Sequence, residues 1–370
     1  MSLDEEIAIA RKEIVADGYD MSVGEIMNLY RDGEIIINPA FQRLFRWTDS
    51  QKTRFIESLL LGIPIPPIFV VQSEKGVWEL IDGLQRLSTV LEFAGLLRRE
   101  DQTLYAPSSL GGTIFLPSLA GKKWEATNDQ TQDGIGKEQQ LQIKRARLRV
   151  EILKKESDPK AKYELFQRLN SGGANLTPQE VRNSVAVMIN PEFYVWLVNR
   201  STDANFVLTT NQTSTALDQQ MGVELALRFL SFRTVPYQAG LDVHEYLDQA
   251  LEALAGNPAF PLQGEEVIFA KTFEWLATAM GDSAFKKWSQ QNDAFGGKFL
   301  MSAFEVVAIG VAANHASIEN MSIPDRKAFL QERIKSLWIN AHFNANSGAG
   351  VRGTTRLANL LPMGAAFFAP

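Results

Sequence analysis

The spacing of apolar residues along the first part of the chain predicts several short helices. Apolar side chains recur at intervals of three and four residues over 23–30, which is typical of an amphipathic helix. A second helix is expected to begin at Thr48, because Thr48 and Gln51 have the spacing of a capping box, and Gly62 is expected to end it. Residues 1–18 and 85–94 are also predicted to be helical.

Other segments of this half carry the patterns of β-strands. Residues 34–37 and the continuous apolar run 68–71 are predicted to be strands, and 78–81 is the expected hairpin partner of that run. Residues 145–152 alternate strictly between apolar and charged side chains, which predicts a half-buried strand. Between them, residues 101–141 show little periodicity and are interpreted as a long loop or insertion.

Beyond Pro191 the strand patterns fade and helical spacing dominates. A second capping box with proline at the first helical position, Thr177 to Glu180, opens a helix that is expected to end near residue 189. We therefore expect an α+β protein with a mixed-sheet domain over 1–190 and an all-helical domain over 191–370. The helical segments predicted in the second domain are 221–232, 242–254, 267–280, 299–313 and 326–339.

Composition narrows the chemistry that the chain can perform. Its 370 residues include no cysteine, which excludes disulfides, cysteine-bound metal and thiol nucleophiles. Three histidines lie far apart in sequence, and none has the spacing of a metal-ligand pair. The acidic start and the absence of an apolar run of about 18 residues lead us to expect a cytoplasmic protein without membrane segments. With a net charge of −6, any contact with DNA must come from a local basic patch.

One segment, Asp82-Gly83-Leu84-Gln85-Arg86, joins a predicted strand to a predicted helix and has the outline of an anion site. The glycine permits a sharp turn, and the first amides of a helix attract anions. Helical spacing places Asp82, Arg86 and Thr89 on one face, where Arg86 would contact a phosphate and Asp82 would hold Mg²⁺ or orient the arginine. The alternative is that Asp82 only caps the helix and Arg86 only pairs with it.

These residues resemble the GmrS-type domain of modification-dependent restriction systems, which has a ParB/sulfiredoxin-like fold. That family carries Asp-Gly-Gln-Gln-Arg between a strand and a helix, and here Leu84 replaces the first glutamine. An upstream family block matches residues 39–47, with phenylalanine in place of both tyrosines. A third block matches 166–170, the glycines at 172–173, and 176–183. The resemblance covers about residues 20–190.

The resemblance implies nucleotide binding and, in some members, NTP hydrolysis coupled to DNA recognition or cleavage. It implies catalytic roles for Asp82 and Arg86, with Mg²⁺ held at Asp82. Together with the helical spacing that adds Thr89, it gives these residues as contacts of the nucleotide or its phosphates: Gln42, Arg43, Gly83, Gln85, Arg86, Thr89, Arg168, Asn170 and Asn183.

A second basic feature is the row Arg145, Arg147 and Arg149 on one face of the predicted strand 145–152. Three guanidinium groups at this spacing match a contact with a phosphate backbone. The same pattern also fits a solvated sheet face paired with nearby acids. Contact with DNA through these arginines is therefore one of two interpretations.

Three functions follow from these observations. The first is an NTP-binding and possibly NTP-hydrolysing sensor or regulatory subunit of a prokaryotic restriction or anti-phage system. Such a subunit would use NTP and Mg²⁺, contact DNA, and work with a separate nuclease subunit. The second is a non-catalytic DNA-binding module that retains a ParB-like pocket. The third is an autonomous metal-dependent nuclease, which is less favoured because the second half contains no cluster of histidines and carboxylates.

Overall fold

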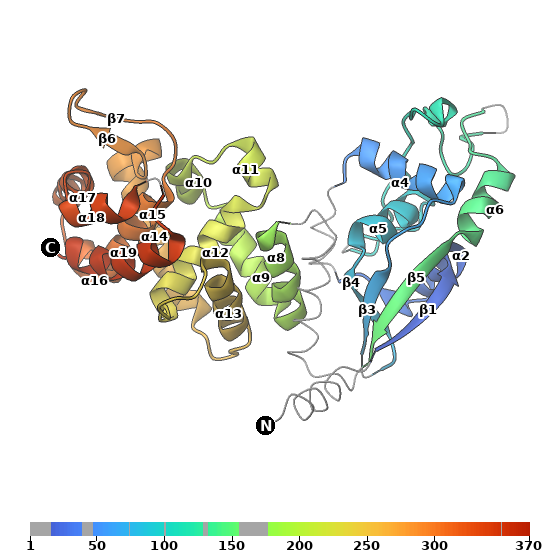
Figure 1. The fold of residues 1–370 in the computed structure, drawn as a ribbon, viewed down its shortest axis with the longest axis horizontal. Coiled ribbons are helices and arrows are strands. Elements are labelled where there is room, and N and C mark those ends of the chain that lie inside the picture. Colours follow the sequence, from blue (N-terminus) through green and yellow to red (C-terminus); the bar gives the residue numbers. More distant parts are fainter. Residues whose placement is uncertain are drawn as a thin grey trace. The chain divides into compact units, whose positions relative to one another are not determined.

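The computed structural model divides the chain into two compact units, Met1–Ala174 and Asn175–Pro370 (Figure 1). It describes residues 16–38, 47–73, 75–99, 101–128, 132–154, 177–348 and 350–370. The sequence pattern predicts a division at residue 190, but the two units divide earlier, between Ala174 and Asn175. The reason is that helix α8 (Pro178–Ile189) packs against α9 (Pro191–Ser201) and α13 (Val243–Ala255), so it belongs to the helical unit.

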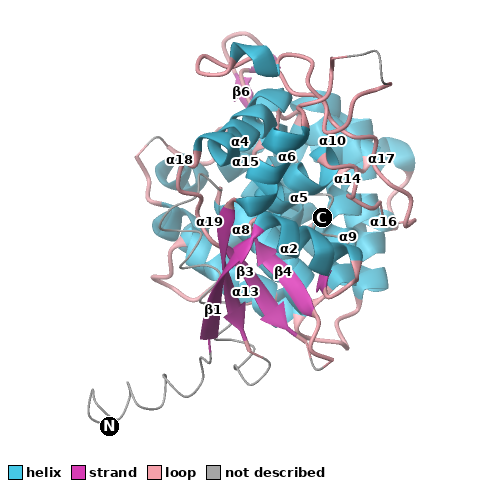
Figure 2. Cartoon of the chain, turned by 90° about the vertical axis from the view of Figure 1, so that its right-hand side faces the viewer, coloured by secondary structure: helices cyan, strands magenta, loops and turns pink. Residues whose placement is uncertain are grey.

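The first unit is built on a five-stranded mixed sheet, whose strands are magenta in Figure 2. In spatial order the strands are β1 (Ala16–Ser22), β5 (Arg147–Leu153), β3 (Ile68–Gln72), β4 (Trp78–Asp82) and β2 (Ile35–Ile36). Strands β1 and β5 are antiparallel, as are β3 and β4, whereas β3 runs parallel to β5 and β2 to β4. A mixed sheet followed by a helical unit confirms the predicted α+β class.

Alternation along the central strands gives the sheet one buried face. Ile68 and Val70 of β3 are fully buried, and so is Val150 of β5. Their neighbours along each strand are half-buried or exposed. This is the period-two pattern of a sheet packed on one side. The hairpin predicted from 68–71 and 78–81 is confirmed as the antiparallel pair β3–β4.

Strand β1 is the main element of this unit that the sequence pattern missed. Residues 16–18, expected to end a helix, instead begin a seven-residue strand that pairs along β5, from Ala16 opposite Leu153 to Ser22 opposite Arg147. Its sequence contains glycine and two aspartates, which are depleted in strands. Pairing with β5 therefore decides its conformation.

Helices α2 (Val23–Arg31), α4 (Asp49–Leu61) and α5 (Leu84–Phe93) form close to the predicted positions. The capping box at Thr48 is confirmed: the Thr48 hydroxyl accepts from the Gln51 amide at 3.3 Å, and the Thr48 amide donates to the Gln51 side chain at 2.9 Å. Gly62 ends α4 in the left-handed conformation, with φ of +69°, as its position predicted.

The segment predicted as a long loop, 101–141, is only partly irregular. In its described part it contains the short 3-10 helix η1 (Pro117–Leu119) and isolated backbone pairings such as that of Lys123 with Gly134. Helix α6 (Lys137–Arg145) begins inside it and extends to Arg145. The strand predicted over 145–152 therefore starts two residues late, as β5, and Arg145 is a helical residue.

The second unit is helical except for one small hairpin, β6 (Lys287–Ser289) and β7 (Ala294–Gly296). The capping box at Thr177 and Glu180 is confirmed at the start of α8. The remaining elements are α10 (Ala204–Thr210), α11 (Ser214–Asp218), α12 (Met221–Thr234), α14 (Leu262–Met280), η2 (Gly281–Ser283), α15 (Met301–Ala313), α16 (His315–Glu319), α17 (Ile323–Leu337), α18 (Ala341–Ser347) and α19 (Gly353–Phe367). The pattern missed the shorter helices α9, α10, α11, α16 and α18, and also the longer helix α19.

The core of this unit combines aromatic packing with a close helix–helix contact. Phe273 contacts Phe206, Phe229 and Phe269, with ring centroids 4.6–5.4 Å apart. Helices α15 and α19 approach so closely that a Cβ added at Gly310 would lie 2.5 Å from the carbonyl oxygen of Gly364. Within the described segments, none of the helices has the length and apolar character needed to cross a membrane.

Candidate functional site

The predicted anion site lies at the junction of β4 and α5, where Asp82 ends the strand and Gly83 precedes the helix. Gly83 has a φ of +93°, which side chains of L-residues rarely permit. A Cβ at this position would lie 2.3 Å from Cγ2 of Ile68, on the neighbouring strand. The junction therefore requires glycine for its backbone angle and for its close approach to β3.

The start of α5 has no side-chain cap in the described part of the chain. Asp82 consequently does not cap the helix, contrary to one half of the alternative interpretation. The first backbone amides of a helix have no partners within the helix, and the positive end of the helix dipole lies among them. A helix N-terminus of this kind favours a bound anion.

Arg86 lies in the first turn of α5, and its side chain is held in a fixed position. Its Nη2 donates to the carbonyl oxygen of Pro67 at 2.9 Å and to Oδ2 of Asp82 at 3.1 Å. The ion pair in the alternative interpretation is therefore present. The side chain is only 15% exposed, and its Nε, which is buried, finds no hydrogen-bond partner among the described residues. Buried donors of this kind are usually satisfied.

Gln85 ties this junction to the segment that precedes α4. Its Oε1 accepts a hydrogen bond from the backbone amide of Trp47 at 3.0 Å, and the Trp47 ring packs edge-on against Phe55 at 5.5 Å. Trp47 ends the block 39–47 that includes the predicted phosphate contacts Gln42 and Arg43. Those two residues, like Arg168 and Asn170, lie outside the described residues.

Thr89 does not line the site, in contrast to the prediction from helical spacing. Its side chain is fully buried, and its hydroxyl donates to the backbone carbonyl of Gln85 at 2.6 Å. Its neighbours Ser88 and Val90 are also buried. The face that Thr89 was expected to share with Asp82 and Arg86 is therefore part of the packed core in this turn.

Asn183, the last predicted phosphate contact, belongs to α8 in the helical unit. Its side chain is buried, and its Oδ1 accepts from Nε2 of Gln179 at 2.8 Å while its Nδ2 faces Oε1 of Gln220 at 3.5 Å. In the described structure both ends of the Asn183 amide are engaged within this unit. Its assignment to a nucleotide remains a prediction.

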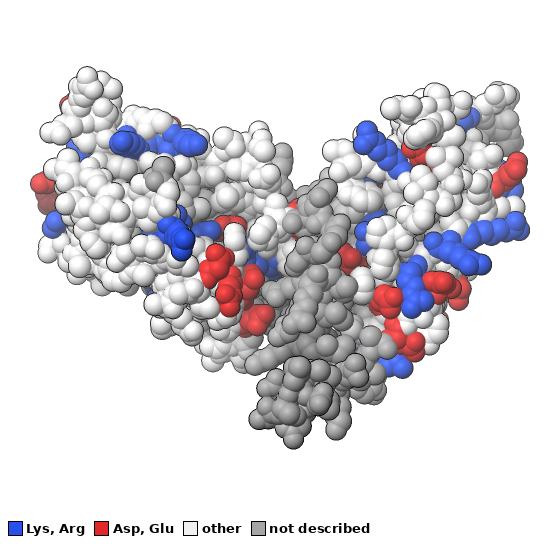
Figure 3. All heavy atoms as spheres, viewed as in Figure 1, with Lys and Arg blue, Asp and Glu red and all other residues white. Residues whose placement is uncertain are grey.

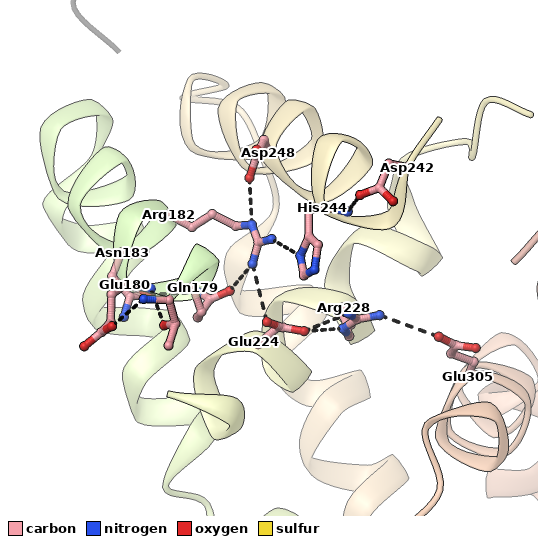
Figure 4. Close-up of polar contacts among 11 residues, drawn as sticks. Gln179, Glu180, Arg182, Asn183, Glu224, Arg228, Asp242, His244, Asp248 and Glu305 are labelled. Atoms are coloured by element: carbon pink, nitrogen blue, oxygen red, sulfur yellow. Dashed lines mark hydrogen bonds and ion pairs between the residues drawn. The ribbon is translucent and has the colours of Figure 1, made fainter. Parts of the chain in front are cut away.

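The neighbouring Arg182 is the centre of a buried ionic network that the sequence analysis missed (Figure 4). The side chain is fully buried and donates from Nε to Oδ1 of Asp248 at 2.7 Å. Its Nη2 lies 2.8 Å from Nδ1 of His244, and its Nη1 lies 3.5 Å from Oε2 of Glu224. Because arginine has no acceptor, the His244 contact requires an unprotonated Nδ1.

The network continues through Glu224 to the core of the unit. Arg228 pairs with Glu224 at 2.7 Å and with Glu305 at 3.6 Å, and Arg356 donates to both oxygens of Glu305 at 2.7 and 3.0 Å. Three arginines thus balance three carboxylates, so no net charge is buried. Glu224 and Arg228 stand four residues apart in the stretch 221–230 of α12, which otherwise contains only apolar residues and glycine, and this is the signal that could have revealed the network.

Burial and ion pairing act in opposite directions on the carboxyl groups of this network. Burial opposes ionisation of Glu224, but Arg228 and Arg182 outweigh it and lower the pKa of this carboxyl group. At Asp248, burial dominates over the attraction of Arg182 and raises the pKa. Both directions follow from the competition between desolvation and nearby opposite charge.

The predicted row of arginines is divided between two elements. Arg149 lies on β5, where it donates to Oε1 of Glu151 at 2.8 Å and lies 3.6 Å from Asp20 on β1. Arg145 ends α6, and Arg147 begins β5. Acidic and basic side chains are intermingled around this part of the surface in Figure 3. The solvated-face interpretation therefore describes Arg149, and contact of the row with DNA remains a prediction.

No group of three or more histidine, aspartate or glutamate side chains gathers as a set of metal ligands within the described ranges. Mg²⁺ is commonly held by one or two carboxylates together with the phosphates of its substrate. Asp82 supplies a carboxylate of the type that Mg²⁺ needs, and Arg86 already orients it. A role of Asp82 as a metal ligand remains a prediction.

Comparison with known families identifies the segment that carries this site. Residues 23–187 match the family model described as the GmrSD restriction endonuclease, N-terminal domain. The match spans the whole sheet except β1 and extends through most of α8. No curated protein matches the chain.

Proposed function

We propose that the first unit, which contains most of the segment 23–187 that matches the family model of the GmrSD restriction endonuclease N-terminal domain, binds a nucleoside triphosphate at the start of α5. The chain would then act as the nucleotide-sensing or regulatory subunit of a prokaryotic restriction system. The observation that carries the proposal is the state of Arg86, which is fixed in the first turn of a helix without a side-chain cap and whose buried Nε has no partner among the described residues.

The phosphate chain would be held by the protein's own donors. The backbone amides of the first turn of α5 favour negative charge, and the guanidinium of Arg86 adds charge-assisted hydrogen bonds. Pro67 and Asp82 orient Arg86 before any ligand arrives, so little side-chain entropy is lost on binding. Gln42, Arg43, Arg168 and Asn170 are the further phosphate contacts in this proposal.

Hydrolysis would use the same two residues. Mg²⁺ at Asp82 would neutralise charge on the phosphates, and Arg86 would stabilise the charge that develops on the transferred phosphoryl group. In this proposal DNA cleavage belongs to a separate nuclease subunit. Release of inorganic phosphate from ATP or GTP by the purified chain measures the hydrolytic part separately from binding.

The test is calorimetric titration of the purified chain with ATP and with GTP in the presence of Mg²⁺. We expect Arg86→Ala to weaken nucleotide binding at least about tenfold, because a charge-assisted hydrogen bond contributes on the order of 1.5–3 kcal/mol. Arg86→Lys keeps the charge but not the planar fork, so it should also weaken binding. Arg149→Ala removes an arginine from the same unit outside the junction and is the matched control.

Thermal melting of the same variants shows whether each one folds. Wild-type affinity in a folded Arg86→Ala protein would contradict the proposal. The same is true of a chain that binds neither nucleotide. If Arg86 only stabilises the junction through Asp82 and Pro67, its replacement should lower the melting temperature and leave nucleotide affinity unchanged.

A further inference from the structure

A groove of about 810 Å³ lies in the first unit, and none of the residues that line it belongs to the β4–α5 junction. It is bordered on one side by the C-terminal end of α4 and the turn that follows, and on the other by α6 and the start of β5. The residues that line it are Leu59, Leu60, Leu61, Gly62, Ile63, Pro64, Ile65, Glu138, Leu141, Gln142, Arg145, Ala146 and Arg147.

Both walls of the groove present apolar side chains to solvent. Leu61 and Ile63 on one wall are 46% and 47% exposed, and Leu141 on the other is 37% exposed. The side-chain amide of Gln142 donates to the carbonyl oxygen of Leu60, so a hydrogen bond joins α6 to α4 between the walls. Exposed apolar side chains on two facing walls are typical of a binding groove.

The charged residues that line the groove are mostly basic. Arg145 and Arg147 are exposed, and neither side chain makes a hydrogen bond or an ion pair with another described residue. Arg149, two residues further along β5, is instead paired with Glu151 and Asp20. Glu138 is the acidic residue among those that line the groove, so two guanidinium groups face one carboxylate.

We propose that this groove docks a short acidic, amphipathic peptide segment of a partner protein. Apolar side chains of the segment would cover Leu61, Ile63 and Leu141, and its carboxylates would pair with Arg145 and Arg147. Charge complementarity selects this occupant over a basic one. Duplex DNA would engage the arginines alone and leave the apolar walls in contact with water, since protein–DNA interfaces are polar.

Fluorescence anisotropy with a labelled synthetic peptide, Leu-Asp-Glu-Leu-Phe-Asp-Glu-Leu, tests this directly. Two companion peptides replace its acids by lysine or its apolar residues by serine. The full chain should bind the parent peptide saturably and both companions at least about tenfold more weakly. The double variant Arg145→Gln/Arg147→Gln and the single variant Ile63→Ser should each weaken binding of the parent peptide by a similar factor.

Arg149→Gln is the matched control, because it removes the same charge from the same strand at an arginine that is already paired. It should bind the parent peptide like the unmodified chain. A charge reversal supplies a gain of function: Arg145→Glu/Arg147→Glu should bind the lysine peptide better than the parent peptide. Thermal melting identifies any variant that fails to fold, and Arg147→Gln alone then replaces the double variant.

Four outcomes would overturn the proposal. The first is no saturable binding of the parent peptide by the unmodified chain. The second is an equal loss in Arg149→Gln, which would indicate bulk charge. The third is undiminished binding of the serine peptide, which would remove the apolar walls from the site. The fourth is binding of a labelled duplex oligonucleotide that depends on Arg145 and Arg147 while the peptide does not bind, which would assign the groove to DNA.

Discussion

The β4–α5 junction and the network around Arg182 both join arginines to carboxylates, but they use the arginines differently. At the junction, Arg86 has one carboxylate partner and one carbonyl partner, and its Nε is buried without a partner among the described residues. In the helical unit, all three nitrogens of Arg182 have partners, and the side chain has no exposed surface.

This difference separates a site that is suited to a ligand from one that stabilises the fold. A buried ion pair contributes little compared with an apolar replacement, but removing one member leaves an uncompensated charge in the core. An arginine whose Nε has no partner among the described residues, placed at a helix N-terminus, has the opposite character, because an external anion would satisfy it. Variants of the two regions should therefore differ in what they change, stability or ligand affinity.

The largest expected effect is loss of stability in Arg182→Ala. Removing this guanidinium leaves Asp248 without its ion-pair partner and Glu224 with Arg228 alone, and a broken buried pair costs about 3–5 kcal/mol. Urea denaturation followed by circular dichroism gives the free energy of unfolding. Arg86→Ala, which is closer to solvent, should lose clearly less.

Arg182→Met separates packing from charge, because methionine restores much of the side-chain volume. It should remain strongly destabilised, since Asp248 still lacks its arginine and Glu224 keeps only Arg228. If Arg182→Ala were no less stable than Arg86→Ala, the network would not have the structural role that its burial indicates.

The second expected effect is loss of stability in Gly83→Ala at the junction. The alanine must keep a positive φ, and its Cβ meets the Ile68 side chain. We therefore expect the free energy of unfolding to fall by at least about 2 kcal/mol. Gly62→Ala is the matched control, because Gly62 also has a positive φ but open space around the position of its Cβ. It should cost about 1 kcal/mol. Equal costs in urea denaturation would argue against the close contact between β3 and the junction.

The smallest expected effect is a change in the pH dependence of stability. The pKa of Glu224 is lowered from its ordinary value of 4.5, so this group adds stability that is present above pH 4.5 and is lost as pH falls through its folded pKa. The pKa of Asp248 is raised from 3.8, so stability that this group contributes at low pH is lost as pH rises through its folded pKa.

Urea denaturation at a series of pH values between about 3 and 6 resolves the two contributions. Glu224→Gln should reduce the rise of stability with pH below 4.5, and Asp248→Asn should remove the opposing fall above 3.8. The slope, not the absolute stability, is compared, because both variants also lose an ion pair. Unchanged slopes in both variants would mean that neither carboxyl group titrates differently in the folded and unfolded states.

Features with short-range causes were predicted from the sequence. The capping boxes at Thr48 and Thr177 and the left-handed end of α4 at Gly62 depend on residues within one helical turn, so their spacing alone identifies them. The hairpin β3–β4 and the glycine between Asp82 and Leu84 belong to the same class. So does the position of Arg86 in the first turn of a helix.

Features that depend on distant partners were decided only by the tertiary structure. Strand β1 forms because it pairs with β5, more than a hundred residues away, although its own composition disfavours a strand. Helical spacing placed Thr89 beside Arg86, but packing of α5 on more than one side buried it. Arg182 and Asp248 are 66 positions apart, so no local pattern brings them together. Local hydrogen bonds depend on residues that are close in sequence, whereas burial and charge pairing depend on which surfaces meet when the chain folds.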